Sequence, residues 1–207
     1  VAQIKAMQTA GADIVRIALP DMESAKAVSA IKEQVSVPLV ADIHFDYRIA
    51  LASVRAGADK IRINPGNIGA KWKVEEVASA CAASSVPIRI GVNGGSLDKR
   101  LLEKYSAPTP EALAESALDE AEALESCGFS DIVISIKSSR TADMIKACRI
   151  ISAQSEHPLH IGVTEAGDEY SGLVKNCVGI GSLLSDGIGD TIRVSLTADP
   201  VREVEAG

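Results

Sequence analysis

The sequence has no apolar run long enough to span a membrane, and it does not begin with the charged and then apolar pattern of a signal peptide. It also has no excess of basic residues, because 28 Asp and Glu outnumber 21 Lys and Arg and leave a formal net charge of -7. Nucleic acid or an anionic membrane would be repelled by this balance, so neither is predicted as a partner. We therefore predict a cytoplasmic protein in which any anion site is local.

Motifs for metal binding and for nucleophilic catalysis are missing as well. Four cysteines, Cys81, Cys127, Cys148 and Cys177, lie far apart and form no CxxC pair or Cys/His cluster. Neither a disulfide framework nor a metal site is predicted from them, and we interpret all four as small buried residues in helices. No Ser-His-Asp or Cys-His combination is recognisable, so the catalytic residues stay unassigned.

What the sequence does contain is a regular alternation. Apolar runs typical of strands alternate with amphipathic helical stretches, which is the pattern of βαβ units with a parallel sheet. Helices are predicted over residues 22–34, 47–56, 72–83, 110–127 and 141–153. Seven strands are predicted, over residues 13–19, 39–45, 60–64, 88–93, 131–138, 159–165 and 191–196.

Seven such units in 207 residues favour an α/β fold of the (β/α)8 TIM-barrel type over a doubly wound sheet. The chain begins at Val1 in a predicted helix, so we expect the first barrel strand to precede it. Asp199 and Pro200 have the pattern of a helix start, and this last helix is expected to be cut short at Gly207. We interpret residues 1–207 as one incomplete substrate-binding barrel domain.

Glycines mark the ends of several predicted helices. Gly11, Gly57 and Gly128 are expected to adopt the left-handed conformation that ends a helix before a strand. The run VGIGSLLSDGIGDT has Leu184 where a GxGxxG phosphate motif needs its last glycine, and it precedes a strand. It is therefore predicted to be a helix-ending turn.

Cationic residues recur inside the predicted strands, at Arg16, Arg62, Arg89, Lys137 and Arg193. If the flanking Ile and Val residues face the helices, these cations face inward, where an unpaired charge is very costly. For any one arginine, an ion pair with a strand carboxylate such as Asp42 or Glu165 is the usual explanation. For all five, two carboxylates are too few, so an anionic ligand is predicted at the C-terminal ends of the strands.

Neutral polar residues accompany the cations. Asn64, Asn93, Ser195 and Thr164 are predicted to face the same way, and the loop from Pro65 to Asn67 is expected at the mouth of the site. His44 lies at a strand end, where it either donates to the anion, transfers a proton or is a packed, hydrogen-bonded residue. His157 and His160 lie at the start of a strand, and we interpret them as structural.

These residues carry a family resemblance. The chain resembles, from about Val1 to Pro200, the barrel domain of 4-hydroxy-3-methylbut-2-enyl diphosphate synthases of the bacterial non-mevalonate isoprenoid pathway. The segments that carry it are ADIHFDYRIAL, KIRINPGNIG, IRIGVNGGSL, IVISIKSS, HIGVTEAG and GIGDTIRVSLTADP. The resemblance implies an oxidoreductase that binds 2-C-methyl-D-erythritol 2,4-cyclodiphosphate and opens its ring reductively with loss of water. It also implies that the diphosphate is bound by Arg16, His44, Arg62, Asn64, Arg89, Asn93, Lys137, Arg193 and Ser195.

The family reduces its substrate on a [4Fe-4S] cluster supplied by flavodoxin or ferredoxin, and it is typically homodimeric. The cluster is held by three cysteines and a glutamate of a C-terminal domain, and that pattern does not occur here. We therefore expect no cluster on this chain and no complete reaction by it alone. Two alternatives stay open, namely a stand-alone phosphate-binding barrel without redox chemistry and a barrel enzyme related to dihydropteroate synthase.

Overall fold

The computed structural model describes residues 1–207, except for the side chain of Ser96. The chain divides into two compact units. The first unit comprises Val1–Ile90 and Glu120–Ile132, and the second comprises Gly91–Asp119 and Val133–Gly207.

The strands of the first unit are parallel and follow one another in chain order. β1 (Val15–Ala18), β2 (Leu39–Asp42) and β3 (Lys60–Ile63) lead to β4 (Ile88–Asn93) and β5 (Ile132–Lys137) in one five-stranded sheet. The last two strands begin in the first unit and continue into the second. The predicted parallel α/β arrangement is thus confirmed, with each of these strands inside its predicted range.

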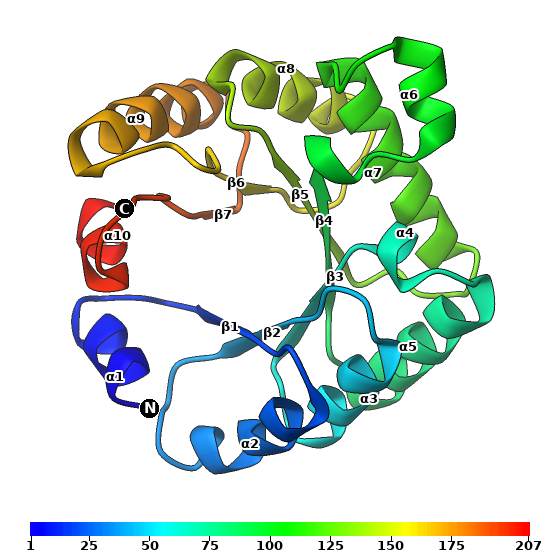
Figure 1. Cartoon of the computed structure of the whole chain (residues 1–207), viewed down its shortest axis with the longest axis vertical. Helices are drawn as coiled ribbons and strands as arrows, with labels where there is room; N and C mark the ends of the chain where they lie inside the picture. Colours follow the sequence, from blue (N-terminus) through cyan, green and yellow to red (C-terminus); the bar gives the residue numbers. More distant parts are fainter. The chain divides into compact units, whose positions relative to one another are not determined.

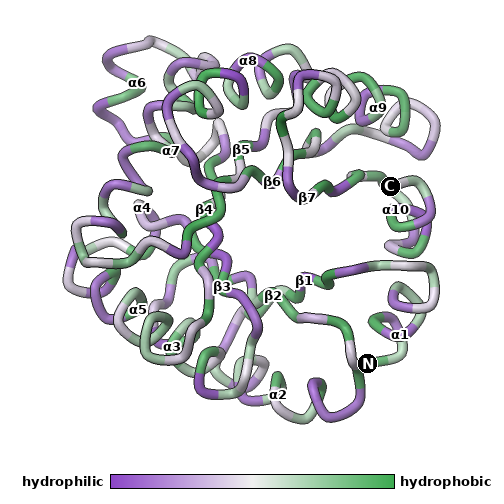
Figure 2. The backbone as a smooth tube through the Cα atoms, turned by 180° about the vertical axis from the view of Figure 1, so that it is seen from behind, coloured by the Kyte–Doolittle hydropathy of each residue, from purple (hydrophilic) through white to green (hydrophobic). Residues whose placement is uncertain are grey.

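Helices of the first unit connect these strands. They are α1 (Ala2–Thr9), α2 (Met22–Lys32), α3 (Tyr47–Arg55), the single turn α4 (Pro65–Ile68) and α5 (Lys71–Ser84). α7 (Pro110–Glu125) spans both units. Figure 1 shows α2, α3 and α5 side by side along β1–β3. Aliphatic side chains fill the space between helices and strands, and Figure 2 shows the hydrophobic colour on strands such as β2 and β4.

The second unit contains two short parallel strands, β6 (His160–Ile161) and β7 (Thr191–Ile192), beside the later part of β5. Its helices are α6 (Lys99–Tyr105), α8 (Thr141–Ser152), α9 (Glu169–Ser185) and α10 (Pro200–Ala206), and a 3-10 turn, η1 (Gly94–Ser96), follows β4. α8 and α9 pack side by side (Figure 1). Asp199 caps α10 by accepting a hydrogen bond from the Val201 N–H at 2.9 Å, as its sequence pattern predicts.

Two predicted strands are much shorter than expected. β6 and β7 have two residues each, where the alternation of side chains predicted six or seven. β6 ends just before Gly162, which adopts φ 157°, and Glu165 further along adopts φ 49°, so the segment after β6 departs from strand geometry. The alternation of apolar residues continues past the ends of β6 and β7, so the sequence pattern alone overestimated the lengths of these strands.

The glycine predictions are confirmed. Gly11, Gly57 and Gly128 have φ values of 104°, 88° and 77°, and each follows the end of a helix. The run VGIGSLLSDGIGDT forms the last turns of α9 and then a turn in which Gly187 has φ 74°. No helix in the described part of the chain is long and apolar enough to cross a membrane.

Candidate anion site

The first unit places charged side chains in one row across neighbouring strands. Asp42 of β2 pairs in register with Arg62 of β3, and Arg62 pairs with Arg89 of β4. All three residues are buried, with 4%, 7% and 7% of their surface exposed. Residues in register on adjacent strands point to the same face of a sheet, so the row is a consequence of strand alignment.

Arg16 reaches the same row from β1. Ala18, two residues after Arg16, is in register with Asp42. Because side chains two residues apart in a strand point to the same face, Arg16 lies on the face of Asp42, two residues nearer the start of the strand. The Arg16 Nη1 donates to Asp42 Oδ2 at 2.8 Å, while Arg62 Nη1 donates to Asp42 Oδ1 at 3.0 Å. One carboxylate therefore bridges two arginines, which confirms the sequence prediction of a strand carboxylate at Asp42.

A fourth cation lies on the same face, closer to the start of β3. Lys60 begins β3 and points to the same face as Arg62, two residues later. Its pKa is lowered, first by burial and second by the positive charge of Arg89. Lys60 thus adds a fourth cation to the face that carries Arg62, and the strand-based prediction overlooked this residue because it opens the strand.

Asn64 and the loop after β3 have a defined local structure. The Asn64 side chain is buried and its Oδ1 accepts a hydrogen bond from the Asn67 N–H at 3.1 Å, which caps α4. Pro65 occupies the first helical position, where its missing N–H costs nothing. A side chain at Gly66 would meet Asn64 Oδ1 at 3.1 Å and Glu120 Oε1 at 3.7 Å. The predicted loop is thus a helical turn, and only glycine fits it without displacing its neighbours.

His44 lies just past β2 and is exposed. Its ring contacts that of Phe45, with centroids 6.1 Å apart, and Phe45 is itself 71% exposed. Of the interpretations left open by the sequence, a packed histidine does not fit this exposure. Its contact with an anion stays a prediction.

An aromatic contact near this strand end was not predicted. Tyr47 at the start of α3 meets Trp72 at the start of α5 edge to face, with centroids 5.3 Å apart. Lys73 Nζ lies 5.8 Å and 5.7 Å from the two ring centroids. These contacts tie the starts of α3 and α5 together beside the end of β2.

The second unit holds the other predicted residues at strand ends. Asn93 is the last residue of β4 and Lys137 the last of β5, and both are half-buried. Ser135 points to the same face as Lys137, two residues earlier, and is 1% exposed. Within the described part of the chain, its hydroxyl has no hydrogen-bond partner.

Arg193 and Ser195 follow β7 and do not belong to it, which corrects the predicted strand. The Arg193 Nη2 donates to Glu203 Oε2 at 3.1 Å, and Glu203 Oε1 also accepts from the Leu196 N–H at 2.8 Å. Glu165, which was predicted as a strand carboxylate for an arginine, is exposed instead. Glu203 was missed because it lies on α10, outside any strand pattern.

The Ser195 backbone is fixed by a buried side chain of α9. Asn176 Nδ2 donates to the carbonyl oxygens of Ser195 at 3.1 Å and Gly172 at 2.9 Å, while its Oδ1 accepts from the Val163 N–H at 3.2 Å. Asn176 is 1% exposed. The segments after β6 and β7 are thereby held to α9.

The cysteines do not fit a metal or cluster site. Burial raises the pKa of both the Cys81 and the Cys148 thiol to about 12, which disfavours the thiolate that binds iron. Cys127 is half-buried and its thiol donates to the Ala123 carbonyl oxygen, whereas Cys177 is exposed. Across the residues that the structure describes, no three His, Cys, Asp or Glu side chains converge as metal ligands would. The prediction that all four cysteines are buried residues in helices is wrong for Cys177, which is exposed, and for Cys127, which is half-buried and follows the end of α7.

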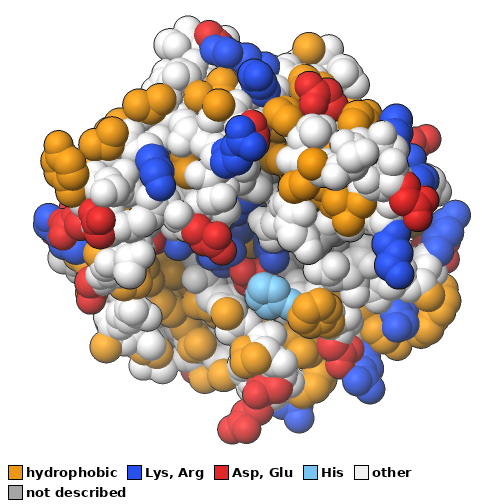
Figure 3. All heavy atoms as spheres, turned by 45° about the horizontal axis from the view of Figure 1, so that its top comes forward, with side chains coloured by type: hydrophobic (Ala, Val, Ile, Leu, Met, Phe, Trp, Pro, Cys, Tyr) orange, Lys and Arg blue, Asp and Glu red, His pale blue; other side chains and the backbone are white. Residues whose placement is uncertain are grey.

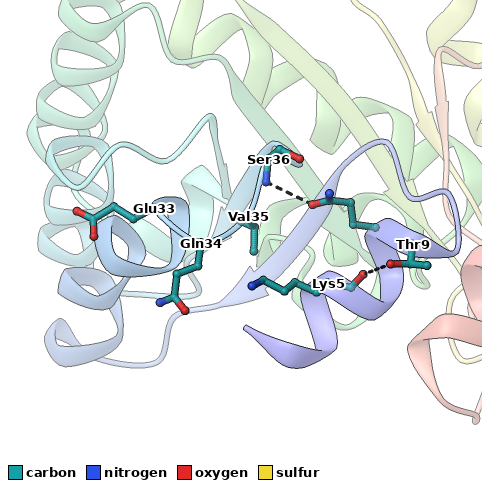
Figure 4. A pocket seen from close by; sticks show the side chains of 7 residues that line it. Lys5, Thr9, Glu33, Gln34, Val35 and Ser36 are labelled. Atoms are coloured by element: carbon teal, nitrogen blue, oxygen red, sulfur yellow. Dashed lines mark hydrogen bonds between the residues drawn. The ribbon is translucent and has the colours of Figure 1, made fainter.

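A surface hollow of about 500 Å³ lies elsewhere in the first unit (Figure 4). It is lined by side chains at the end of α1 and in the segment between α2 and β2, where the Ser36 N–H donates to Gln8 Oε1 at 3.3 Å. This is the end at which the parallel strands start, opposite Asp42. The hollow is therefore separate from the arginine row.

Comparison with known proteins gives a consistent result. The model of one family, described as the GcpE TIM-barrel domain, matches residues 1–207. A protein of Symbiobacterium thermophilum named 4-hydroxy-3-methylbut-2-en-1-yl diphosphate synthase (flavodoxin) is 58% identical over 99% of this chain and 55% of its own length. A protein of the same name from Clostridium perfringens is 57% identical over 100% of this chain and 59% of its own. The chain thus spans little more than half the length of these relatives.

Solved structures share the fold at low identity. A dihydropteroate synthase from Thermus thermophilus has a TM-score of 0.66 at 16% identity, covering 99% of this chain and 84% of its own. The enzyme from Xanthomonas albilineans has a TM-score of 0.64 at 16% identity, covering 99% and 80%. With the family match, these likenesses place the chain in the TIM-barrel class of α/β folds.

Proposed function

Because the chain belongs to the GcpE TIM-barrel domain family, we propose that it is the substrate-binding barrel of a 4-hydroxy-3-methylbut-2-en-1-yl diphosphate synthase. Its substrate is 2-C-methyl-D-erythritol 2,4-cyclodiphosphate, which the full-length oxidoreductase (EC 1.17.7.-) opens reductively and dehydrates. The observation that carries this proposal is the row in which the buried Asp42 bridges Arg16 and the buried Arg62, beside the buried Arg89.

The row suits a diphosphate for a physical reason. Guanidinium groups match phosphate oxygens in charge and geometry, and a ligand of parallel α/β folds binds where the strands end. Opening the ring transfers negative charge to the phosphate oxygen that leaves carbon. Arg62 and Arg89 beside that oxygen would stabilise the developing charge because their positions are set before the substrate arrives.

The remaining predicted residues have narrower support. His44 and Asn64 follow the ends of β2 and β3, the two strands that carry Asp42 and Arg62. Asn93, Lys137, Arg193 and Ser195 stay in the predicted set on the strength of the family resemblance.

Electron supply requires redox groups in addition to the strand residues of this chain. The names of the relatives point to flavodoxin as the donor, and ferredoxin is the alternative. An iron-sulfur cluster would supply the electrons to the substrate, but the cysteines of this chain do not fit one, so we derive no step through it. We propose that the full-length protein holds the cluster with other residues, and that it works as a cytoplasmic homodimer.

The alternatives are less well supported. Relatives that are 57% and 58% identical to this chain over the aligned residues carry the synthase name, whereas the dihydropteroate synthases are 16% identical and support the fold alone. The relatives named above do not favour a phosphate-binding barrel without redox chemistry.

The proposal is tested by titrating the chain with the cyclic diphosphate in a calorimeter. Arg62→Ala and Arg89→Ala are expected to weaken binding by about 2 to 3 kcal/mol each, because each removes a charged hydrogen-bond donor from the anion. Arg48→Ala is the matched control, since Arg48 is exposed and paired with Asp46. Equal affinities for the control and the Arg62 and Arg89 variants would remove the row from the site.

A further inference from the structure

Asp42 holds an unusual position among the charged residues of the first unit. Its two carboxylate oxygens are divided between two arginines from strands on either side, Arg16 of β1 at 2.8 Å and Arg62 of β3 at 3.0 Å. Only 6% of the Asp42 side chain is exposed, against 8% for Arg62 and 31% for Arg16. The carboxylate is thus the deepest point of the three, and both guanidinium groups converge on it.

We propose that Asp42 is a positioning residue for anion binding, which acts by holding Arg16 and Arg62 in the orientation that receives the ligand. This inference rests on the proposed function, because it assumes that the arginine row binds an anion. Asp42 itself does not touch the ligand, since two negative groups would repel each other. Its effect reaches the ligand only through the two arginines.

The physical basis is the conformational freedom of arginine. A long side chain loses rotamer freedom when it binds a ligand, and this loss weakens binding unless the side chain is already held. A buried carboxylate between two strands removes that freedom from both arginines at once. The arginines stay in place because β1, β2 and β3 fix the three backbones in register.

An electrostatic interpretation without positioning makes the opposite prediction. Asp42 carries a negative charge close to the anion, so its removal by itself would strengthen anion binding. If Asp42 positions the arginines, its removal weakens anion binding despite that gain. The sign of the change in affinity therefore separates the two interpretations.

The experiment compares Asp42→Asn with the unsubstituted chain, using inorganic diphosphate and the cyclic diphosphate as separate probes in calorimetry. We expect the dissociation constant of Asp42→Asn to rise at least tenfold for each probe that binds. Asn keeps the shape of Asp, but its amide N–H₂ would face one guanidinium as a second donor and release it. An unchanged or lower dissociation constant would overturn the proposal.

Asp59→Asn is the matched control in the same unit. Asp59 also bridges two elements, since it accepts from Lys32 Nζ and from the Leu39 N–H, but it lies where β2 and β3 begin. We expect it to lower thermal stability without changing affinity for either probe. A loss of affinity in Asp59→Asn equal to that in Asp42→Asn would show that general destabilisation explains both and would overturn the proposal.

A test in a doubly substituted chain shows whether Asp42 affects anion affinity through Arg16 and Arg62. In a chain that already carries Arg16→Gln and Arg62→Gln, adding Asp42→Asn is expected to cause no further loss of affinity, because the residues it positions are gone. A further tenfold loss in that background would mean that Asp42 acts on the ligand by another route. Binding of inorganic diphosphate without the cyclic diphosphate would reject the proposed substrate while leaving the Asp42 comparison decisive.

A measurement on the unsubstituted chain covers the case in which Asp42→Asn does not fold. Nitrogen-15 NMR of the arginine side chains reports whether each Nε–H is restrained. We expect the Arg16 and Arg62 signals to be restrained before any anion is added. Signals that become restrained only with diphosphate present would show that the ligand, and not Asp42, orders the arginines.

Discussion

Single residues in this protein acquire their chemistry from what lies beside them in the fold. The same arginine that is costly as an isolated charge in a strand becomes acceptable when a carboxylate on the next strand accepts its N–H. Asp42 on the neighbouring strand accepts from Arg62, and Glu203 on α10 accepts from Arg193. The two pairs differ in origin, because Asp42 is aligned by strand register and Glu203 is brought in by a helix.

Cysteine reactivity is a property that belongs to this scale. We expect iodoacetamide at pH 8 to modify Cys177, which is exposed, and to leave Cys81 and Cys148 unmodified in the native chain. Burial raises the pKa of the latter two thiols to about 12, so almost no reactive thiolate is present.

Peptide mass spectrometry after alkylation checks this expectation. The same reaction in urea is the control, because unfolding exposes all four thiols and should label each of them. Rapid labelling of Cys148 in the native chain would mean that α8 opens readily.

At the scale of elements, the ends of β6 and β7 decide where Arg193 and Ser195 lie. Gly162 follows β6, and a Cβ atom there would overlap the carbonyl oxygen of Arg193. These two backbones approach closely where the β6–β7 ladder ends, and the Arg193 N–H donates to the Ile161 carbonyl oxygen at 3.0 Å there. The glycine therefore serves packing between segments and not only local flexibility.

Gly162→Ala should destabilise the chain by about 3 kcal/mol, since the added methyl group forces two backbones apart and the φ of 157° is unfavourable for alanine. Thermal or urea unfolding measures the change. Gly181→Ala is the matched control, because Gly181 lies in α9 with no atom close to its Cβ position, and alanine there should raise stability by up to about 1 kcal/mol. Equal stability of Gly162→Ala and the unsubstituted chain would contradict the close approach.

At the scale of the whole molecule, charge and exposed apolar surface set how the chain meets its surroundings. Figure 3 shows basic and acidic side chains interspersed on the face in view. The net charge of -7 repels anions at long range, so diphosphate binding must depend on the local arginine row.

The exposed apolar surface of α9 predicts that the whole molecule self-associates. α9 exposes Tyr170 by 80%, Val174 by 49% and Val178 by 55%, and Lys175 is the one charged residue between Tyr170 and Ser185. A second copy of the same surface can pack against it around a two-fold axis and bury little charge. Val178→Lys is expected to convert dimers into monomers in sedimentation experiments, because it places two like charges near that axis.

Leu102→Lys on α6 is the control for this test, since Leu102 is also an exposed apolar residue but lies outside α9. It should leave the dimer intact. Dimers that persist in Val178→Lys would place the interface on another surface.

Local patterns in the sequence were sufficient for the order of the strands and of the helices predicted between them, for the capping of α10 by Asp199 and for the turn glycines. They were sufficient because hydrophobic periodicity, capping and left-handed turns depend on residues only a few positions apart. The recurrence of arginine in strands also indicated an anion site, and the pairing of Arg62 with Asp42 followed from strand alignment. The eight-strand count of a closed barrel stays a prediction.

Tertiary structure alone decided which residue pairs with each charged side chain and where the strands β6 and β7 end. Glu203 pairs with Arg193 from a helix that no strand pattern includes, and Lys60 joins the cations through the fold of β3 beside β4. At the ends of β6 and β7 the backbones of Gly162 and Arg193 approach closely, although the two residues are 31 positions apart in the chain. Such contacts depend on distances in space, and a linear pattern of neighbours does not contain them.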